Sequence, residues 1–303
     1  MRVLMIFFDG WGLGSQDAAT NPFLSVPMPT LHDLVNGKMP TNGNGHFQSN
    51  KATVVPTDAT LGIPGLPQSA TGQTTILTGV NAPQAIGEHS GPYPNPALRE
   101  ILSRENLYHR LLAANKRVAF ANAYPPFFFD RLKRDKARRS AMAFAAGAAN
   151  VRYRTIDDLR AGDAISMFVT NDKWIEFGAE VPLITPREAG RNLARIAQDN
   201  DFTLFEYSMT DIAGHKSDWQ FATQVIAEVD DILRGVLDEI DANEMLLLTT
   251  SDHGNIEDLS AKGHTRNPVP TLLVGKHHAD IAKRIHALTD LTPTIVEVIL
   301  QEN

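Results

Sequence analysis

Aspartates and histidines at the ends of apolar segments are the side chains in this sequence best suited to chemistry. Three apolar runs, at 3–8, 202–209 and 245–250, each lead into such residues. The set consists of Asp9, Asp211, His215, Asp252, His253 and, somewhat further on, His264. Any one of these is as readily a turn cap or a surface residue. Together, three carboxylates and three imidazoles form a ligand set that suits two divalent ions such as Zn²⁺ or Mn²⁺.

A candidate nucleophile lies in the stretch 67–79, where a serine and a glycine precede an apolar run that ends in Thr78-Gly79. A helix beginning at Ala70 would place Ser69 at its N-cap, where free backbone N–H groups and the helix dipole favour negative charge. Taken alone, Ser69 is more simply interpreted as an ordinary N-cap. The metal-type ligands elsewhere favour a nucleophile, because a serine hydroxyl needs activation such as metal coordination to attack.

The apolar runs predict the strands that must position these side chains. Parallel strands are buried on both faces and therefore read as continuous apolar segments, and open α/β sheets bind ligands at their carboxyl ends. Helical patterns alternate with the runs, so we expect an α/β fold, a three-layer α/β/α sandwich around a mostly parallel central sheet with a small insert. The expected strands are 3–8, 52–55, 117–122, 202–209, 245–250 and 269–274. The expected helices are 95–116, 186–198, 217–240 and one that begins at Thr292-Pro293, with the threonine as cap.

Residues 124–180 interrupt this alternation and are predicted to form a small insert or cap. The metal-binding catalytic core would then comprise residues 1–123 and 181–303. Within the insert, the stretch 131–139 concentrates basic residues, namely Arg131, Lys133, Arg134, Lys136, Arg138 and Arg139. A basic run is usually a solvated helix face. The alternative is that it recognises an anionic or polar part of a substrate, with Arg131 and Arg134 as candidates.

Composition limits the possible classes of protein. With 303 residues, 43% of them hydrophobic, the chain can bury a large core. The absence of cysteine excludes disulfides and thiolate metal sites, and the net charge of −7 argues against general nucleic-acid binding. No apolar run approaches the roughly 20 residues that span a bilayer, and residues 1–8 predict a buried strand rather than a signal peptide. We expect a cytoplasmic protein that acts away from membranes, and the oligomeric state stays open.

The motifs resemble the alkaline phosphatase superfamily, in particular the branch that holds cofactor-independent phosphoglycerate mutase and phosphopentomutase. The resemblance extends from one end of the chain to the other. It rests on Phe8-Asp9-Gly10, the stretch 69–79, Asp211-x-x-x-His215, Asp252-His253-Gly254, His264-Thr265-Arg266-Asn267-Pro268-Val269-Pro270 and Asp290-Leu291-Thr292-Pro293-Thr294.

This resemblance implies two metal sites and a serine nucleophile. One ion would be held by Asp9, Ser69, Asp252 and His253, and the other by Asp211, His215 and His264. Two such ions clamp the attacking and leaving oxygens of an in-line phosphoryl displacement. Family spacing places the nucleophile at Ser69, with Thr71 and Thr74 as the next candidates. Arg266 and the 131–139 stretch are the candidates for meeting the phosphoryl charge.

The chain departs from its relatives in two places, and a further carboxylate needs interpretation. Gln68 stands where alkaline phosphatases have an aspartate, and the predicted insert is small beside the large cap of the mutases. Glu206 falls at the place of a third-metal carboxylate, although a strand-end hydrogen-bond acceptor is the simpler interpretation. We therefore expect a metal-dependent hydrolase that acts on a small phosphorylated metabolite through a phosphoserine. A phosphomutase, a sulfatase or phosphodiesterase on the same frame, and a non-catalytic metal or phosphate sensor are the alternatives.

Overall fold

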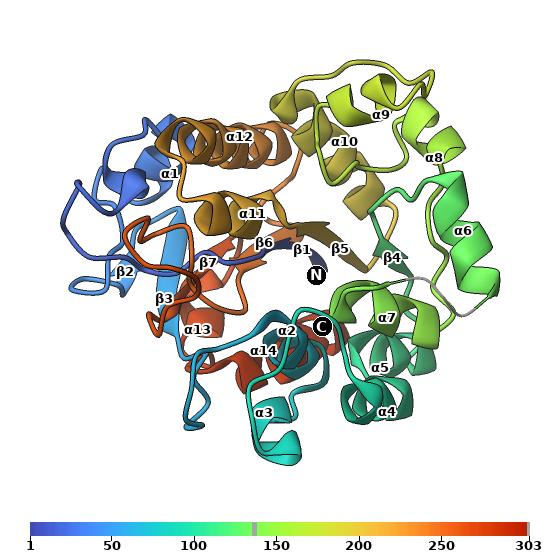
Figure 1. Ribbon diagram of the computed structural model, residues 1–303, viewed down its shortest axis with the longest axis horizontal. Helices are drawn as coiled ribbons and strands as arrows, with labels where there is room; N and C mark the ends of the chain where they lie inside the picture. Colours follow the sequence, from blue (N-terminus) through green and yellow to red (C-terminus); the bar gives the residue numbers. More distant parts are fainter. Residues whose placement is uncertain (135–137, 302–303) are drawn as a thin grey trace.

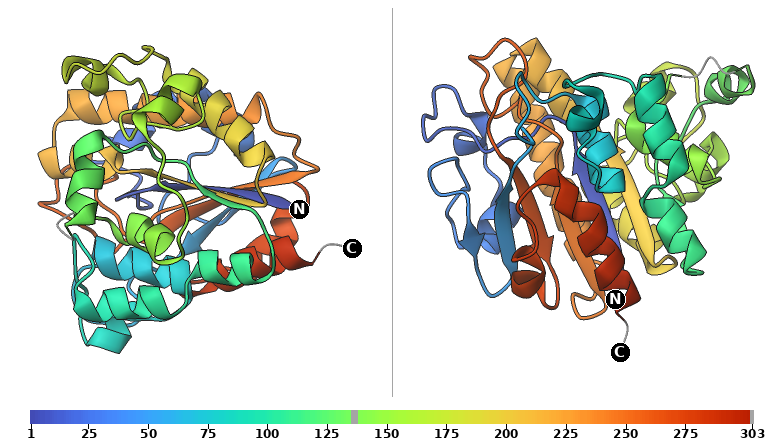
Figure 2. Two further views of the ribbon diagram at one scale, coloured as in Figure 1. Left: turned by 90° about the vertical axis from the view of Figure 1, so that its right-hand side faces the viewer. Right: turned by 90° about the horizontal axis from the view of Figure 1, so that it is seen from below.

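The structure is a computed structural model that describes residues 1–134 and 138–301. A seven-stranded sheet lies between two layers of helices, as the edge-on view in Figure 2 shows. The strand order is β2-β3-β7-β6-β1-β5-β4. The strands are β1 (Arg2–Phe8), β2 (Phe47–Gln48), β3 (Ala52–Thr57), β4 (Val118–Phe120), β5 (Phe202–Tyr207), β6 (Met245–Thr250) and β7 (Val269–Val274).

Most strands of this sheet point the same way. β4, β5, β1 and β6 pair in parallel, whereas β7 runs antiparallel to β6 and β3 runs antiparallel to β7. β3 therefore has the direction of β1, and only β7 and the short edge strand β2 are reversed. The expected mostly parallel three-layer α/β fold is confirmed.

Alternation along β1 explains why helices cover both faces. Leu4, Ile6 and Phe8 belong to the core on one face, and the intervening residues of β1 belong to the core on the other. The first face is covered by α1 (Pro29–Leu34), α10 (Pro186–Gln198), α11 (Met209–Lys216) and α12 (Trp219–Leu237) (Figure 1). The second is covered by α2 (Ser69–Thr78), α3 (Ala82–Ile86), α4 (Pro96–Arg104), α5 (Leu107–Ala113), α7 (Ala141–Ala148), α13 (His278–Ala282) and α14 (Leu291–Leu300). Two short 3₁₀ helices, η1 (Pro22–Leu24) and η2 (Leu288–Asp290), complete these layers.

The structure corrects three predicted element boundaries, two of them because a side chain makes a different contact. The expected helix 95–116 is two helices, since buried Asn106 accepts hydrogen bonds from Tyr108 N (2.9 Å) and His109 N (3.3 Å) and so caps α5. The C-terminal helix begins at Leu291, and the Thr292 hydroxyl donates to the carbonyl of Ile76 (2.7 Å) instead of capping. β4 covers only the middle of the expected strand 117–122.

A further boundary concerns the nucleophile candidate. α2 includes Ser69 as its first residue, with Gln68 at the N-cap position. Ser69 therefore does not cap the helix, and its hydroxyl lies beside His253.

The segment 124–180 contains α6 (Pro126–Lys133), α7, α8 (Ile156–Ala161) and α9 (Asp172–Glu176). Its parts differ in where they pack. α7 contributes Met142 and neighbouring alanines to the main core beside α2 and α4, whereas Trp174 and Leu159 form a small separate cluster. The division of the chain at 124 and 180 stays a prediction, and Lys136 lies outside the described residues.

Within 1–134 and 138–301, no helix is both long enough and apolar enough to cross a bilayer.

Candidate active site

Two neighbouring parallel strands place the first group of ligand-type residues. β1 ends at Phe8 and β6 at Thr250, so Asp9 and the pair Asp252-His253 emerge side by side at one edge of the sheet. His253 Nε2 lies 3.3 Å from Asp9 Oδ1 and 3.6 Å from Asp252 Oδ1. The Ser69 hydroxyl is 3.1 Å from the same nitrogen. The structure thus brings together the four residues expected to hold one ion.

The second group comes from α11 and from the loop before β7. Asp211 and His215 lie one helical turn apart, and His215 Nε2 is 3.4 Å from Asp211 Oδ2. His264 Nε2 is 3.2 Å from His215 Nε2 and 3.6 Å from Asp211 Oδ1. His264 precedes its strand, and it reaches the same edge because β7 runs antiparallel to β6. His215 is half exposed, so this group opens to solvent.

The two groups adjoin each other. The rings of His253 and His264 stack with their centroids 3.6 Å apart and their planes at 15°. Asp9, Asp252 and His253 have ligand atoms within 4.8 Å of one another, and so do Asp211, His253 and His264. Gly10, with φ of +70°, permits this approach, since a Cβ there would lie 2.8 Å from Asp211 Oδ1.

Burial without a counter-charge perturbs these groups. Burial, followed by the nearby Asp252 carboxylate, raises the pKa of Asp9 well above its usual range. Burial and then Asp211 raise the pKa of Asp252 to about 7. Burial, with a smaller contribution from His264, lowers the pKa of His253 to about 3. The protein alone therefore does not supply the positive charge that its carboxylates require.

The histidine hydrogen bonds show where that positive charge would sit. Nδ1 of His264 faces the carbonyl of Pro67 (2.8 Å), and Nδ1 of His253 faces the carbonyl of Gly254 (3.4 Å). This geometry assigns the proton to Nδ1 and the lone pair to Nε2. Nε2 of His253 then faces Asp9 Oδ1, a buried oxygen that lacks a hydrogen-bond partner among the described residues. Lone pairs directed at one another fit a divalent cation, so we conclude that this edge of the sheet binds divalent metal.

Gln73 was not singled out from the sequence, although it supports the first group. Its Nε2 lies 3.2 Å from Asp252 Oδ2 and 3.4 Å from Asp9 Oδ2, and its Oε1 accepts from Ala141 N (3.1 Å). α2 can come this close because residue 72 is glycine, whose Cβ would lie 2.7 Å from Asp252 Cβ. Gln73 thus orients two carboxylates and ties them to the start of α7.

Glu257 is a second supporting residue that the sequence did not predict. Its side chain is fully buried and joins three loops that carry site residues. Its only signal in the sequence was its place four residues after His253. Its oxygens accept hydrogen bonds from Gly12 N (3.0 Å), Asn255 N (2.7 Å), Asn267 Nδ2 (3.0 Å) and the Thr265 hydroxyl. Asn255 in turn donates to Asp211 Oδ1 (2.7 Å), so Glu257 supports both groups of ligands.

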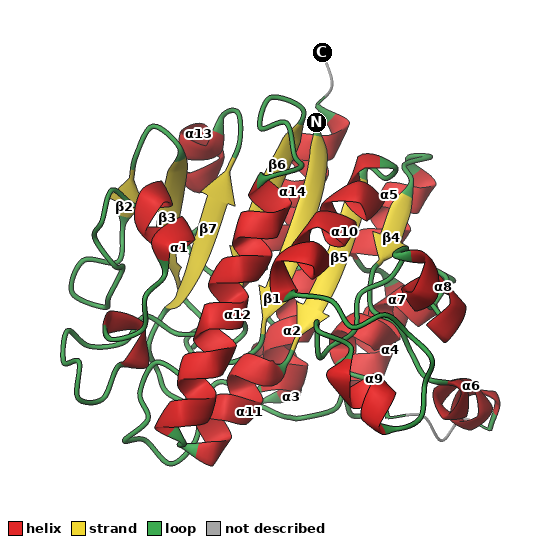
Figure 3. Ribbon diagram, turned by 90° about the horizontal axis from the view of Figure 1, so that it is seen from above, coloured by secondary structure: helices red, strands yellow, loops and turns green. Residues whose placement is uncertain are grey.

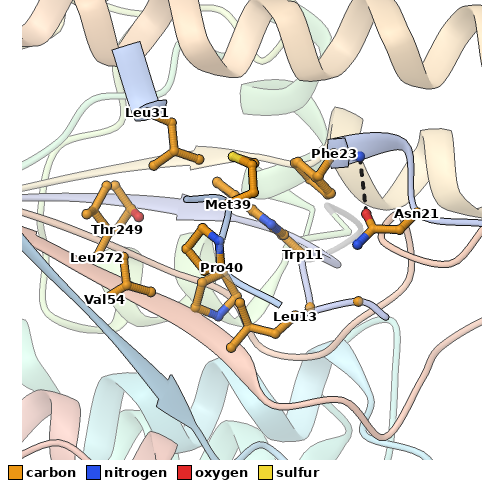
Figure 4. A pocket seen from close by; sticks show the side chains of 13 residues that line it. Trp11, Leu13, Asn21, Phe23, Leu31, Met39, Pro40, Val54, Thr249 and Leu272 are labelled. Atoms are coloured by element: carbon orange, nitrogen blue, oxygen red, sulfur yellow. Dashed lines mark hydrogen bonds between the residues drawn. The ribbon is translucent and has the colours of Figure 1, made fainter. Parts of the chain in front are cut away.

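The loop after Asp9 is anchored by aromatic packing. Trp11 stacks on Phe23, with ring centroids 4.9 Å apart and planes at 7°, and the backbone N–H of Trp11 donates to the Ser251 hydroxyl (2.9 Å). Figure 4 shows these rings in a small apolar pocket with Met39 and Pro40. The pocket has a volume of about 10 Å³, room for one water at most. It is a packed support for the Asp9 loop.

The remaining candidate hydroxyls and carboxylate are engaged elsewhere. The hydroxyls of Thr71 and Thr74 donate to the carbonyls of Gln68 (3.0 Å) and Ala70 (2.6 Å) within the helix, so Ser69 presents the hydroxyl at the metal ligands. Glu206 accepts from the Ser140 hydroxyl (2.7 Å), and burial raises its pKa to about 7.

The candidate arginines lie further out. The guanidinium of Arg266 is exposed and donates to the carbonyl of Gly65, four residues before Ser69. Arg131 and Arg134 are exposed on and directly after α6, with Arg131 over the ring of Phe127 at 5.6 Å. The roles assigned to these arginines stay predictions.

Comparison with known proteins decides the family. The metalloenzyme superfamily profile matches residues 1–303. The chain belongs to the metalloenzyme superfamily. Among curated members, a 2,3-bisphosphoglycerate-independent phosphoglycerate mutase of Desulforudis audaxviator is 31% identical over 124 residues, 39% of this chain and 24% of that protein. Another from Coxiella burnetii is 29% identical over 222 residues, 65% of this chain and 41% of that protein. The matches thus span less than half the length of these relatives.

Solved structures agree on the fold of this superfamily member. The PH0037 protein of Pyrococcus horikoshii superposes with a TM-score of 0.60 at 12% identity, covering 100% of this chain and 98% of that one. Alkaline phosphatase from the Antarctic bacterium TAB5 gives a TM-score of 0.51 at 11% identity, with the same coverage. At such identities the likeness concerns the fold. The expected similarity to cofactor-independent phosphoglycerate mutases is confirmed, and so is the alkaline-phosphatase-like fold.

Proposed function

We propose that this metalloenzyme is a two-metal phosphoryl hydrolase that acts on a small phosphorylated metabolite through phospho-Ser69. The observation that carries the proposal is the Ser69 hydroxyl 3.1 Å from His253 Nε2, at the first turn of α2 and beside Asp9 and Asp252. A hydroxyl in that position can attack a phosphoryl group, and the N–H groups of the first helical turn can bind its anionic oxygens.

The proposal assigns a role to each residue of the site. Asp9, Ser69, Asp252 and His253 would hold one Zn²⁺ or Mn²⁺ ion, and Asp211, His215 and His264 the other. When bound, such ions lower the pKa of coordinated hydroxyls and water and neutralise phosphoryl charge. Gln73 and Glu257 keep the carboxylates and loops in place, and Arg266 is the candidate for binding the transferred group.

The chemistry balances in two displacements. In the first, the bond from Ser69 Oγ to phosphorus forms, the ester oxygen–phosphorus bond breaks, and the leaving alkoxide takes up the serine proton. In the second, water attacks phospho-Ser69, so inorganic phosphate leaves and the serine hydroxyl is restored. Apart from the phosphate ester and one water molecule, the two displacements consume no reactant.

A phosphomutase is the second candidate, favoured by the similarity to the two phosphoglycerate mutases. A mutase must keep water from the phosphoserine while its substrate reorients, which requires a closing cap. Support for hydrolysis comes from the segment 124–180, where α7 packs into the main core and leaves little chain for such a cap.

Labelled water separates the two reactions. Metal-loaded protein is incubated with sugar phosphates and an aryl phosphate in ¹⁸O water, and free phosphate and isomerised ester are followed separately. Hydrolysis predicts label in released phosphate at the rate of substrate loss. Isomer that accumulates with little free phosphate would establish the mutase, and metal binding without any turnover would favour a sensor.

The nucleophile is tested with matched variants. Ser69→Ala should abolish turnover and leave the fold and the Asp211 site intact, because no other described residue depends on this hydroxyl for a hydrogen bond except His253. Thr71→Val, two residues along α2, is the control and should retain activity. The opposite pattern would move the nucleophile to Thr71.

A further inference from the structure

An apolar pocket of about 560 Å³ opens beyond β4, between α6, α8 and α9. Its size falls in the range of roughly 300–1,000 Å³ that is usual for small-molecule sites. The side chains that line it include Tyr124, Phe127, Ile156, Phe168, Trp174 and Phe177. None of the candidate metal ligands lines this pocket.

The pocket has a rigid wall and an exposed rim. Trp174 is buried, and its indole N–H donates to the Ser166 hydroxyl (2.8 Å), which satisfies its polar atom. Tyr124 stacks on Phe128 with ring centroids 4.0 Å apart. At the rim, by contrast, Phe127 is 61% exposed and Phe177 is 83% exposed. Large aromatic side chains left in water around an apolar hollow indicate a binding function.

The sheet register places one wall of this pocket near Asp9, which shares its neighbour His253 with Ser69. The side-chain amide of Asn122 hydrogen-bonds to the backbone N–H and carbonyl of Glu206 on β5, so the next residue, Ala123, lies level with Tyr207. Tyr207 in turn pairs with Phe8, the residue before Asp9. β5 is the one strand between β4 and β1. Two strand spacings of about 4.8 Å therefore separate the pocket wall from the Asp9 strand, about 10 Å in all. Figure 3 shows α6 and α9 at the same end of the sheet as α11.

We propose that this pocket holds the apolar group of an amphiphilic phosphate monoester whose phosphoryl group lies at Ser69. The inference rests on the proposed function and names the class of substrate: an ester whose aromatic or branched aliphatic group lies about 10 Å or more from phosphorus, since two strand spacings separate the pocket wall from the Asp9 strand. A three-carbon phosphate ester does not extend that far. Arg131, which lies over Phe127, stands at the rim of this pocket and would meet any polar end of that group.

The first experiment compares phosphate monoesters of increasing length on metal-loaded protein: phenyl, 2-phenylethyl and 4-phenylbutyl phosphate. We expect kcat/KM to rise with length. The double variant Phe127→Ala/Phe177→Ala should lower kcat/KM for the 4-phenylbutyl ester about tenfold and leave the phenyl ester within about twofold. Leu183→Ala is the matched control, because Leu183 is 68% exposed in the same region but does not line the pocket.

A second readout does not depend on turnover. Calorimetric titration with 4-phenylbutanol should show binding to the wild type and to Leu183→Ala, and loss of binding in the double variant. Binding of the alcohol without turnover of any ester would overturn the proposed function and retain the pocket. Equal kcat/KM for all three esters, absence of alcohol binding, or an effect of the double variant on self-association alone would overturn the inference.

Discussion

Replacement of Glu257 by glutamine tests whether this buried carboxylate holds the metal-binding loops in place. The wild-type side chain accepts four hydrogen bonds, two from backbone N–H groups of Gly12 and Asn255 and two from Thr265 and Asn267. The glutamine oxygen can keep the two backbone donors, and its NH₂ group must then face Thr265 and Asn267. The threonine hydroxyl can turn to accept, whereas the asparagine NH₂ group loses its partner.

The expected loss of stability in Glu257→Gln follows from these hydrogen bonds. Hydrogen bonds to a charged acceptor contribute about 1.5–3 kcal/mol and neutral ones about 0.5–1.5 kcal/mol, so the two retained bonds lose about 1 kcal/mol each. The unpaired Asn267 donor costs about 1 kcal/mol more, and relief of the buried charge offsets part of the sum. We expect the free energy of unfolding to fall by about 2 kcal/mol. Since Asn255 orients Asp211, affinity for the ion at Asp211, His215 and His264 should fall about 10–100-fold.

The assay combines urea unfolding with calorimetric titration of Mn²⁺ or Zn²⁺ into chelator-stripped protein. Asp258→Asn is the control, because it makes the same charge change one residue along, where Asp258 Oδ1 accepts only from Ser260. Thr265→Val removes a single donor and should give a smaller effect in the same direction. The reasoning is refuted if Glu257→Gln unfolds like the wild type and binds both ions with unchanged affinity.

Two further predictions concern the buried carboxylates. Asp252→Asn should reduce the bound metal from two ions to one per chain, measured by elemental analysis after reloading, because Asp252 is fully buried among the first group of ligands; unchanged stoichiometry would contradict its assignment. In chelator-stripped protein, burial raises the pKa of Glu206 from near 4.5 to about 7, so the native state keeps a proton that the unfolded state releases, and stability falls as pH rises between these values. Asp9 and Asp252 titrate too, so the comparison with Glu206→Gln isolates this group: the variant should gain up to about 3 kcal/mol relative to wild type between pH 4 and 8 in urea unfolding, and a constant difference would exclude the shift.

Sequence alone determined the central strands and the chemical character of the site. The runs at 3–8, 245–250 and 269–274 are buried on both faces of the sheet, so nearly every residue in them is apolar and the pattern is local. Asp9 and the pair Asp252-His253 come just after the runs 3–8 and 245–250, and parallel strands end at a common edge. Their proximity could therefore be predicted without knowing the strand order.

Only the tertiary structure decided how those residues are held. Glu257 and Gln73 are ordinary polar residues in the sequence, and their roles come from partners up to 245 positions away. His264 arrives at the site because β7 is reversed, and the apolar pocket exists because α6, α8 and α9 meet beyond β4. Asn106 divides a continuous helical pattern for a similar reason, since its amide also donates to the distant carbonyl of Ala145 (3.1 Å). Periodicity records which face of an element is buried, whereas these features depend on which donor or ring another part of the chain brings to that face.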